Sequence, residues 1–147
     1  MIAEELKTRA NVLVELRGAD GQLKETRSVH NLVVTVGKNH VADQLSSSPG
    51  ESAMSHMEVG TGTNAAAAGD TTLQTALDRN ALTSRTDAAA VVTYVGTWNA
   101  GDGTGAITEG GIFNAGSGGT LLARAVWSVV NKAAGDSLVI TWTVTVG

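Results

Sequence analysis

Cysteine is absent from this 147-residue sequence, proline occurs once, at Pro49, and aromatic residues make up only 3%. Without cysteine the chain has no disulfide, no thiolate metal ligand and no cysteine nucleophile, so packing must supply its stability. Charged residues are also few, at 16%, and the net charge is −4. The ten basic residues are scattered along the sequence. They form no basic stripe for a phosphate backbone, so we expect no nucleic-acid partner.

Long apolar runs are missing as well. No run approaches the ~20 residues that cross a bilayer. The first nine residues, MIAEELKTR, lack the apolar core of a signal peptide. We therefore expect no membrane association, and a protein that is made in the cytoplasm and is used there or assembled there into something larger.

Glycine is abundant, with 18 residues, and threonine and valine are frequent. This composition favours short strands joined by glycine turns. Residues 11–17 alternate in polarity and are followed by the turn sequence GADG, so residues 11–29 are predicted to form a β-hairpin. Further strands are expected at 55–59, 80–86, 89–99, 105–114, 120–130 and 137–146.

Because these strands follow one another without intervening helices, we expect a mainly all-β protein. Its architecture would be an antiparallel β-sandwich, of which the jelly roll is one form, with one or two short helices. Residues 1–10 would form an N-terminal arm and residues 11–147 a single sandwich domain. The strand at 137–146 alternates most regularly, whereas the strand at 120–130 is apolar on both faces and is expected to be covered on both sides.

Two segments have helical features. In residues 32–45, four apolar residues fall on one helical stripe, namely Val34, Val41, Ala42 and Leu45. In residues 71–77, Thr71 and Gln74 have the spacing of a capping box, which predicts a short helix of about two turns.

The sequence MEVGTGTNAAAAGDTTLQTAL, residues 57–77, has the order of a phosphate site: a strand end, a glycine-rich loop and a helix start. A dinucleotide fingerprint fails because its third glycine position is occupied by Ala65, and a P-loop fails because the segment has no lysine. A structural role remains. Gly60 and Gly62 would turn the chain with positive φ angles, and Asp70 and Thr71 would cap the short helix.

Other catalytic and metal-binding patterns are also missing. His30, His40 and His56 have no metal-ligand spacing. Ser117 lies in AGSGG, where Ala115 replaces the first glycine of a nucleophile elbow, so we interpret this segment as a hairpin tip. We therefore expect no catalytic residue, no metal and no cofactor, and a protein that is not an enzyme.

Two further residues are given roles. Glu109 stands between strand halves beside two glycines, so its carboxylate is expected to accept backbone hydrogen bonds and to lock a bend. Trp98, at a strand end, is the best candidate for an exposed contact, whereas Trp127 and Trp142 are expected in the core. A carbohydrate-binding module or a small hydrolase would use Trp98 and the acids near it.

The succession of motifs resembles a family of small structural proteins of tailed double-stranded DNA bacteriophages. The resemblance covers roughly residues 28–147 and rests on HNLVVTVGKNHVADQL, SHMEVGTGTNAAAAGDTTLQTAL with Arg79, GDGTGAITEGGIFNAGSGGTLLARAVWS, and GDSLVITWTVTVG. It implies a β-sandwich virion component of the capsid decoration, or cement, type. Such a protein binds the outside of the head, contacts the major capsid protein and acts as a dimer or trimer.

Turns of the TEGGIFN kind also occur in tail-fibre and tail-collar proteins, so a tail structural module is the alternative that this resemblance leaves open. The arm lies outside the resemblance. Its residues Ile2 and Leu6 are one helical turn apart, and the arm is expected to contact a neighbouring subunit by packing or strand addition.

Overall fold

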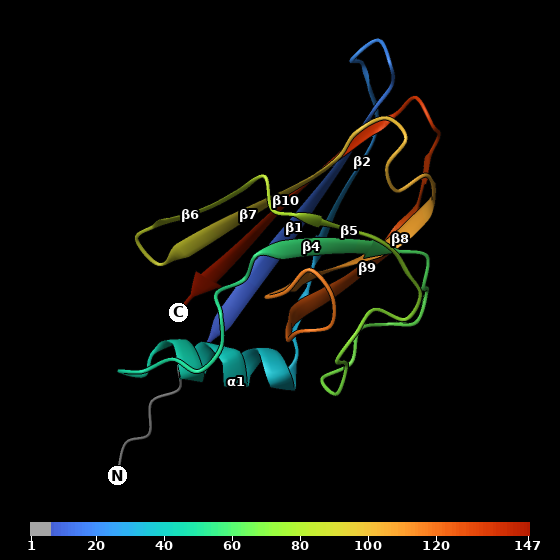
Figure 1. Cartoon of the computed structure of the whole chain (residues 1–147). Helices are drawn as coiled ribbons and strands as arrows, with labels where there is room; N and C mark the ends of the chain where they lie inside the picture. Colours follow the sequence, from blue (N-terminus) through green and yellow to red (C-terminus); the bar gives the residue numbers. More distant parts are fainter. Residues whose placement is uncertain (1–6) are drawn as a thin grey trace.

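Two five-stranded antiparallel sheets pack face to face in the computed structural model, which describes residues 7–147 (Figure 1). Sheet A has the strand order β2-β1-β10-β7-β6 and sheet B the order β3-β9-β8-β4-β5. The strands of sheet A are β1 (Thr8–Arg17), β2 (Leu23–His30), β6 (Ser84–Ala88), β7 (Val91–Trp98) and β10 (Ser137–Val146). Those of sheet B are β3 (Leu32–Val33), β4 (His56–Gly60), β5 (Ala76–Ala81), β8 (Gly105–Phe113) and β9 (Leu121–Lys132). The predicted antiparallel β-sandwich is confirmed.

The strand β10 shows how the sequence pattern places the core. It lies in the middle of sheet A, where Trp142 pairs with Val12 of β1 on one side and Tyr94 of β7 on the other. Its alternate residues Leu138, Ile140, Trp142 and Val144 are buried between the sheets. Because successive side chains point to opposite faces of a sheet, the regular alternation was sufficient to predict this strand.

The predicted hairpin is present as β1 and β2, and Gly21 at its turn has a φ of 80°. The predicted boundary of the arm was wrong, because β1 begins at Thr8, which pairs with Val146. Residues 8–10 therefore belong to the sandwich. Ile2 and Leu6, the proposed contact residues of the arm, lie outside the described residues.

The helix α1 (Thr35–Gln44) is shorter than the predicted segment 32–45. Leu32 and Val33 precede it as β3 and pair with β9, which removes them from the helix. The buried residues of α1 are Gly37 and His40. Of the predicted apolar stripe, Val34 is buried at the N-cap and Val41 packs against the core, whereas Ala42 is exposed and Leu45 is 73% exposed. A Cβ atom at Gly37 would overlap the backbone of Leu122, so the glycine allows α1 to approach β9 closely.

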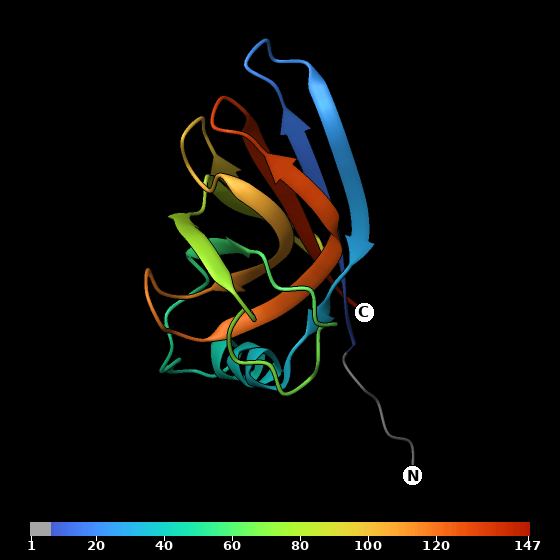
Figure 2. The ribbon, with the colours of Figure 1, turned by 90° about the vertical axis from the view of Figure 1, so that its right-hand side faces the viewer.

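The view in Figure 2 shows α1 beneath the curved strand β9, at one end of the sandwich. Within residues 7–147, no helix has the length and apolar character needed to cross a membrane.

The single strand predicted at residues 80–86 is instead the point at which the chain changes sheets. The strand β5 ends at Ala81 in sheet B, and β6 begins at Ser84 in sheet A. The alternation of polarity could not reveal this break, because two short strands in succession have nearly the same pattern as one longer strand.

Candidate functional site

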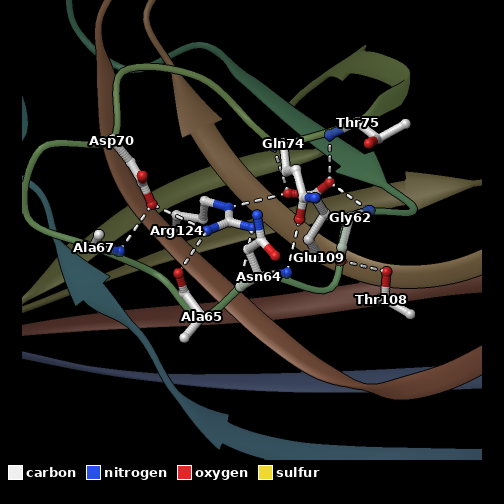
Figure 3. A network of polar contacts seen from close by, with 10 residues as sticks. All are labelled: Gly62, Asn64, Ala65, Ala67, Asp70, Gln74, Thr75, Thr108, Glu109 and Arg124. Carbon is white, nitrogen blue, oxygen red and sulfur yellow. Dashed lines mark hydrogen bonds and ion pairs between the residues drawn. The ribbon is translucent and has the colours of Figure 1, made fainter.

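The loop of residues 61–75 connects β4 to β5 and covers part of sheet B. Few of its backbone groups bond to other backbone groups: the N–H of Thr61 donates to the carbonyl of Thr75 at 2.9 Å, and Ala68 accepts from the N–H of Thr35 at 2.8 Å. Leu73 packs in a small second core with Val34, Phe113 and Leu121. Side chains of β8 and β9 bind further backbone groups at both ends of the loop, in residues 62–65 and 74–75 (Figure 3).

Glu109 is the central acceptor of this arrangement. Its side chain in β8 is fully buried. One carboxylate oxygen, Oε2, accepts the N–H groups of Gly62 at 2.7 Å and Thr75 at 2.8 Å. The other, Oε1, accepts the N–H of Gln74 at 2.9 Å and the Nε–H of Arg124 at 3.0 Å. A single carboxylate thus replaces the backbone partners that the loop lacks.

Burial alone would raise the pKa of Glu109, because it disfavours the charged form. The hydrogen bonds from Thr75, Gln74, Arg124 and Gly62 more than offset burial and lower the pKa below its usual value of 4.5. The carboxylate is therefore ionised at neutral pH, with a buried positive charge beside it.

Arg124 supplies that positive charge from β9, where it is 2% exposed. Its Nη1 bonds to Oδ2 of Asp70 at 3.0 Å and to the carbonyl of Ala65 at 3.3 Å, and its Nη2 bonds to the carbonyl of Asn64 at 2.9 Å. Together with Glu109, these partners occupy each nitrogen of the guanidinium. A buried charge requires such pairing, because an unpaired one is very costly.

Gly60 and Gly62 are needed for close approach, and the prediction that they have positive φ angles was wrong. A Cβ atom at Gly62 would overlap Oε2 of Glu109, and one at Gly60 would overlap the carbonyl of Thr75 and lie 2.7 Å from the same carboxylate oxygen. The two glycines therefore let the chain pass directly against Glu109.

The short helix predicted at 71–77 was also wrong. The N–H groups of Gln74 and Thr75 donate to Glu109 instead of to helical carbonyls, and β5 begins at Ala76. Asp70 caps a turn, not a helix: its Oδ2 accepts the N–H of Ala67 at 2.9 Å and also binds Arg124. Thr71 is exposed and precedes no helix. The capping-box spacing was misleading because a distant carboxylate satisfies these donors.

The network formed by Glu109, Arg124, Asp70 and the 61–75 loop, called here the loop network, fixes backbone. Both oxygens of Glu109 are occupied, and its side chain has no contact with solvent. The sequence indicated a backbone-binding role for Glu109, but the donors come from a loop 34 to 47 residues away. Arg124 was not singled out, although an arginine in the otherwise apolar segment LLARAVW is a usable signal for a paired buried charge.

A second arginine fixes the neighbouring hairpin tip. Arg79 in β5 binds Oε2 of Glu58 at 2.9 Å and lies 3.7 Å from the centre of the Phe113 ring. Its Nη1 donates to the carbonyls of Ala115 at 3.0 Å and Gly118 at 2.8 Å. The segment around Ser117 is thus a hairpin tip between β8 and β9, held in place by Arg79.

Trp98 is fully buried, so the prediction of an exposed contact was wrong. It belongs to the inward face of β7, which also buries Tyr94 and Gly96. Glycines at 96 and 103 leave room for its ring. Trp127 and Trp142 are buried as well, at 5% and 0% exposure. The carbohydrate-binding and hydrolase hypotheses relied on Trp98 and lose their structural basis.

The three histidines do not converge. His30 is exposed at the end of β2, His56 is half-buried in β4, and His40 is buried in α1. Within the described part of the chain, no group of three or more His, Asp or Glu residues is arranged to hold a metal ion.

A groove of roughly 780 Å³ lies between α1 and the beginning of β1. Its lining is basic and apolar: Lys7, Thr8, Arg9, Val33, Lys38, Val41, Ala42, Leu45 and Gly147. A second hollow of about 630 Å³ shares Thr8, Arg9, Val33 and Lys38 with it, so the two are continuous. No pattern in the sequence indicated this groove, because its walls come from both ends of the described chain and from the helix.

No protein-family model matches the chain, and no curated protein sequence or solved structure shows significant similarity to it.

Proposed function

We propose that this chain is a non-enzymatic structural protein of a tailed-phage virion, of the capsid decoration type. In this role it binds the outer surface of the head and stabilises contacts between major capsid subunits. Its site of action is the capsid exterior, after assembly in the host cytoplasm, and its partners are the major capsid protein and further copies of itself as a dimer or trimer.

The observation that supports this proposal most is that three of the segments that carry the resemblance meet in the loop network. The GTGT segment contributes Gly62, the TEGGIF segment Glu109, and the LLARAVWS segment Arg124. The residues that mark the resemblance are therefore those that hold an exposed loop at a defined position on the sandwich.

Such a fixed surface suits a protein that acts by binding in many copies. A rigid loop loses little conformational entropy on binding, so a modest contact area is used efficiently. Many copies on one shell then add their small contributions through multivalent attachment. The net charge of −4 likewise suits a surface partner made of protein rather than nucleic acid.

The direct experiment compares virions assembled with and without this chain. We expect heads that lack it to rupture and release DNA at a lower temperature, and purified protein added back to restore the original temperature. An unrelated protein of similar size and net charge is the control for non-specific protection. An unchanged rupture temperature would overturn the cement role.

Immunogold electron microscopy of intact virions provides the location. Gold particles distributed over the head surface are expected. Labelling confined to the tail would contradict head decoration and would support the tail structural module instead.

A further inference from the structure

The groove between α1 and β1 is not used by the loop network. Three cations line it: Lys7, Arg9 and Lys38, all exposed. None of them forms an ion pair with another residue in the range 7–147. Three of the ten basic residues of an otherwise acidic chain are thus gathered, without acidic partners, around one concave surface.

The same groove has an apolar wall. Val41 and Ala42 lie in the last turn of α1 and Leu45 is its C-cap residue, and Leu45 is the most exposed of the large apolar residues of the described chain. A groove with one basic and one apolar component fits an extended segment that carries acidic and apolar side chains together.

Residues 1–6, MIAEEL, have this composition. Glu4 and Glu5 are acidic, and Met1, Ile2 and Leu6 are apolar. Extended, six residues span at most about 20 Å. The helix α1, with ten residues, is about 15 Å long. The segment is thus long enough to lie along the whole helix. We propose that the groove of one copy binds residues 1–6 of a second copy of this chain.

The position of Lys7 favours a second copy over the same chain. The carbonyl of Lys7 accepts the N–H of Gly147 at 2.6 Å, and Thr8 is paired with Val146 in the ladder of β1 and β10. The chain therefore enters β1 at a fixed point that is itself part of the groove wall. In its own groove, Leu6 is tied to the edge formed by Lys7, because the two residues are consecutive in the chain. A segment from a second copy can place both Ile2 and Leu6 against α1.

Reciprocal exchange of the segments gives a closed twofold dimer, in which each copy donates one segment and offers one groove. The acidic side chains of the segment then lie among the three cations of the groove, and its apolar side chains lie against the apolar wall formed by Val41, Ala42 and Leu45. This dimer requires only the groove and the segment. It does not depend on the capsid role, and failure to bind phage heads would leave it unaffected.

The test uses two full-length charge variants. Variant one carries Glu4→Lys and Glu5→Lys, and variant two carries Arg9→Glu and Lys38→Glu. Each variant alone places like charges between segment and groove, so we expect sedimentation velocity to show dimerisation weakened by at least about tenfold in each. Mixing the two variants matches every segment with an oppositely charged groove. Native mass spectrometry of the mixture should then show the mixed dimer restored, and this dimer should weaken as salt is added.

The matched control is Arg17→Glu, which reverses a charge at the opposite end of β1. It should leave the dimer unchanged. All substituted positions of the groove are exposed, and circular dichroism and thermal unfolding of each variant report that the fold is intact. A wild-type chain that stays monomeric at all concentrations, or a mixture that forms no mixed dimer, would overturn the proposal. Binding of the segment within its own chain gives both of these outcomes.

Discussion

Glu109 and Arg124 are diagonal neighbours on adjacent strands. In the ladder of β8 and β9, Glu109 lies opposite Val126 and Arg124 lies opposite Gly111. The Nε of Arg124 reaches Oε1 of Glu109 at 3.0 Å. Diagonal residues of this kind are within reach of long side chains, so the sheet itself sets the pair in place before the loop is added. In the loop network, the sheet therefore sets the position of Glu109 and Arg124, and the 61–75 loop depends on these two side chains for its own position.

Replacing Glu109 with Gln tests this dependence. The glutamine keeps the shape but removes the charge opposite Arg124 and turns a donor group toward the N–H groups of the loop. Because the buried Arg124 then loses its fully buried carboxylate partner and keeps only Asp70, we expect the free energy of unfolding to fall by about 3–5 kcal/mol. Urea denaturation followed by circular dichroism measures it. The control Glu25→Gln affects a partly exposed surface ion pair with Arg27 and should cost less than about 1 kcal/mol. Equal effects of the two substitutions would contradict the central role of Glu109.

A double-mutant cycle with Arg124→Met isolates the interaction between the two charges. Each single substitution removes one charge of the buried pair and leaves the other in place, whereas the double variant removes both charges of the pair together. We expect the double variant to be more stable than the sum of the single effects predicts, with a coupling of roughly 1–3 kcal/mol. Chemical denaturation of the four proteins gives this value. Simple additivity would mean that Arg124 and Glu109 act separately on the loop.

The contrast between Gly62→Ala and Gly69→Ala tests the role of close approach. A Cβ at position 62 would overlap the carboxylate of Glu109, whereas one at position 69 meets nothing within 4 Å. We expect Gly62→Ala to destabilise the protein by about 1–3 kcal/mol because the loop must move away. Gly69→Ala should stay within about 0.5 kcal/mol of the wild type. Melting temperatures of the two variants report the difference, and equal values would exclude the steric explanation.

Acid should destabilise the protein through Glu109. Its folded-state pKa lies below the usual 4.5, so in mildly acidic solution the unfolded chain binds more protons than the folded one. The stabilisation is fully present above the unfolded pKa and is lost as the pH falls through the lowered folded pKa. Asp136, whose pKa is lowered by the N–H of Ala133 and by Lys24, acts in the same direction. Unfolding measured from pH 7 down to pH 3 should show this decline, and Glu109→Gln should make it shallower. A variant with the slope of the wild type would contradict the assignment.

Trp98→Ala tests the corrected position of this tryptophan. Removing a fully buried indole creates a cavity between the sheets, and we expect a loss of about 3–5 kcal/mol. Leu23→Ala, at a side chain that is 48% exposed, should cost no more than about 0.5 kcal/mol. Thermal unfolding of both variants gives the comparison. A mild effect of Trp98→Ala would mean that the ring is accessible after all.

The sequence predicted the structure correctly where one regular spacing of apolar residues determined it. The regular alternation of Leu138, Ile140, Trp142 and Val144 predicted a strand with one buried face, and β10 has that form. The apolar segment around Leu122 predicted a strand covered on both sides. This holds for the first part of β9, which is buried from Leu121 to Ala125, whereas Ser128 and Val129 are exposed.

The sequence misled where distant partners decided the structure. Gln74 and Thr75 had a local helix signal, but the carboxylate of Glu109 offered their N–H groups better placed acceptors. Trp98 stands at the end of its strand, a position that suggested exposure. In the structure it is the last inward-facing residue of β7 and is fully buried. The backbone conformation at residues 74–75 and the burial of Trp98 depend on residues that are close in space but distant in the sequence, so a local sequence pattern cannot predict them.

The central place of β10 in sheet A has a consequence for folding during synthesis. This strand is the last along the described chain, yet it supplies the partners of both β1 and β7. Until β10 has emerged from the ribosome, β1 and β7 each have an unpaired edge at the middle of the sheet. Thr8, for example, cannot pair until Val146 has been synthesised. Closing so long a loop slows folding and leaves unpaired strands exposed to neighbouring chains. The pairing of β10 thus determines when the edges of β1 and β7 stop being available to other chains. The partly made chain should bind chaperones most just before β10 emerges.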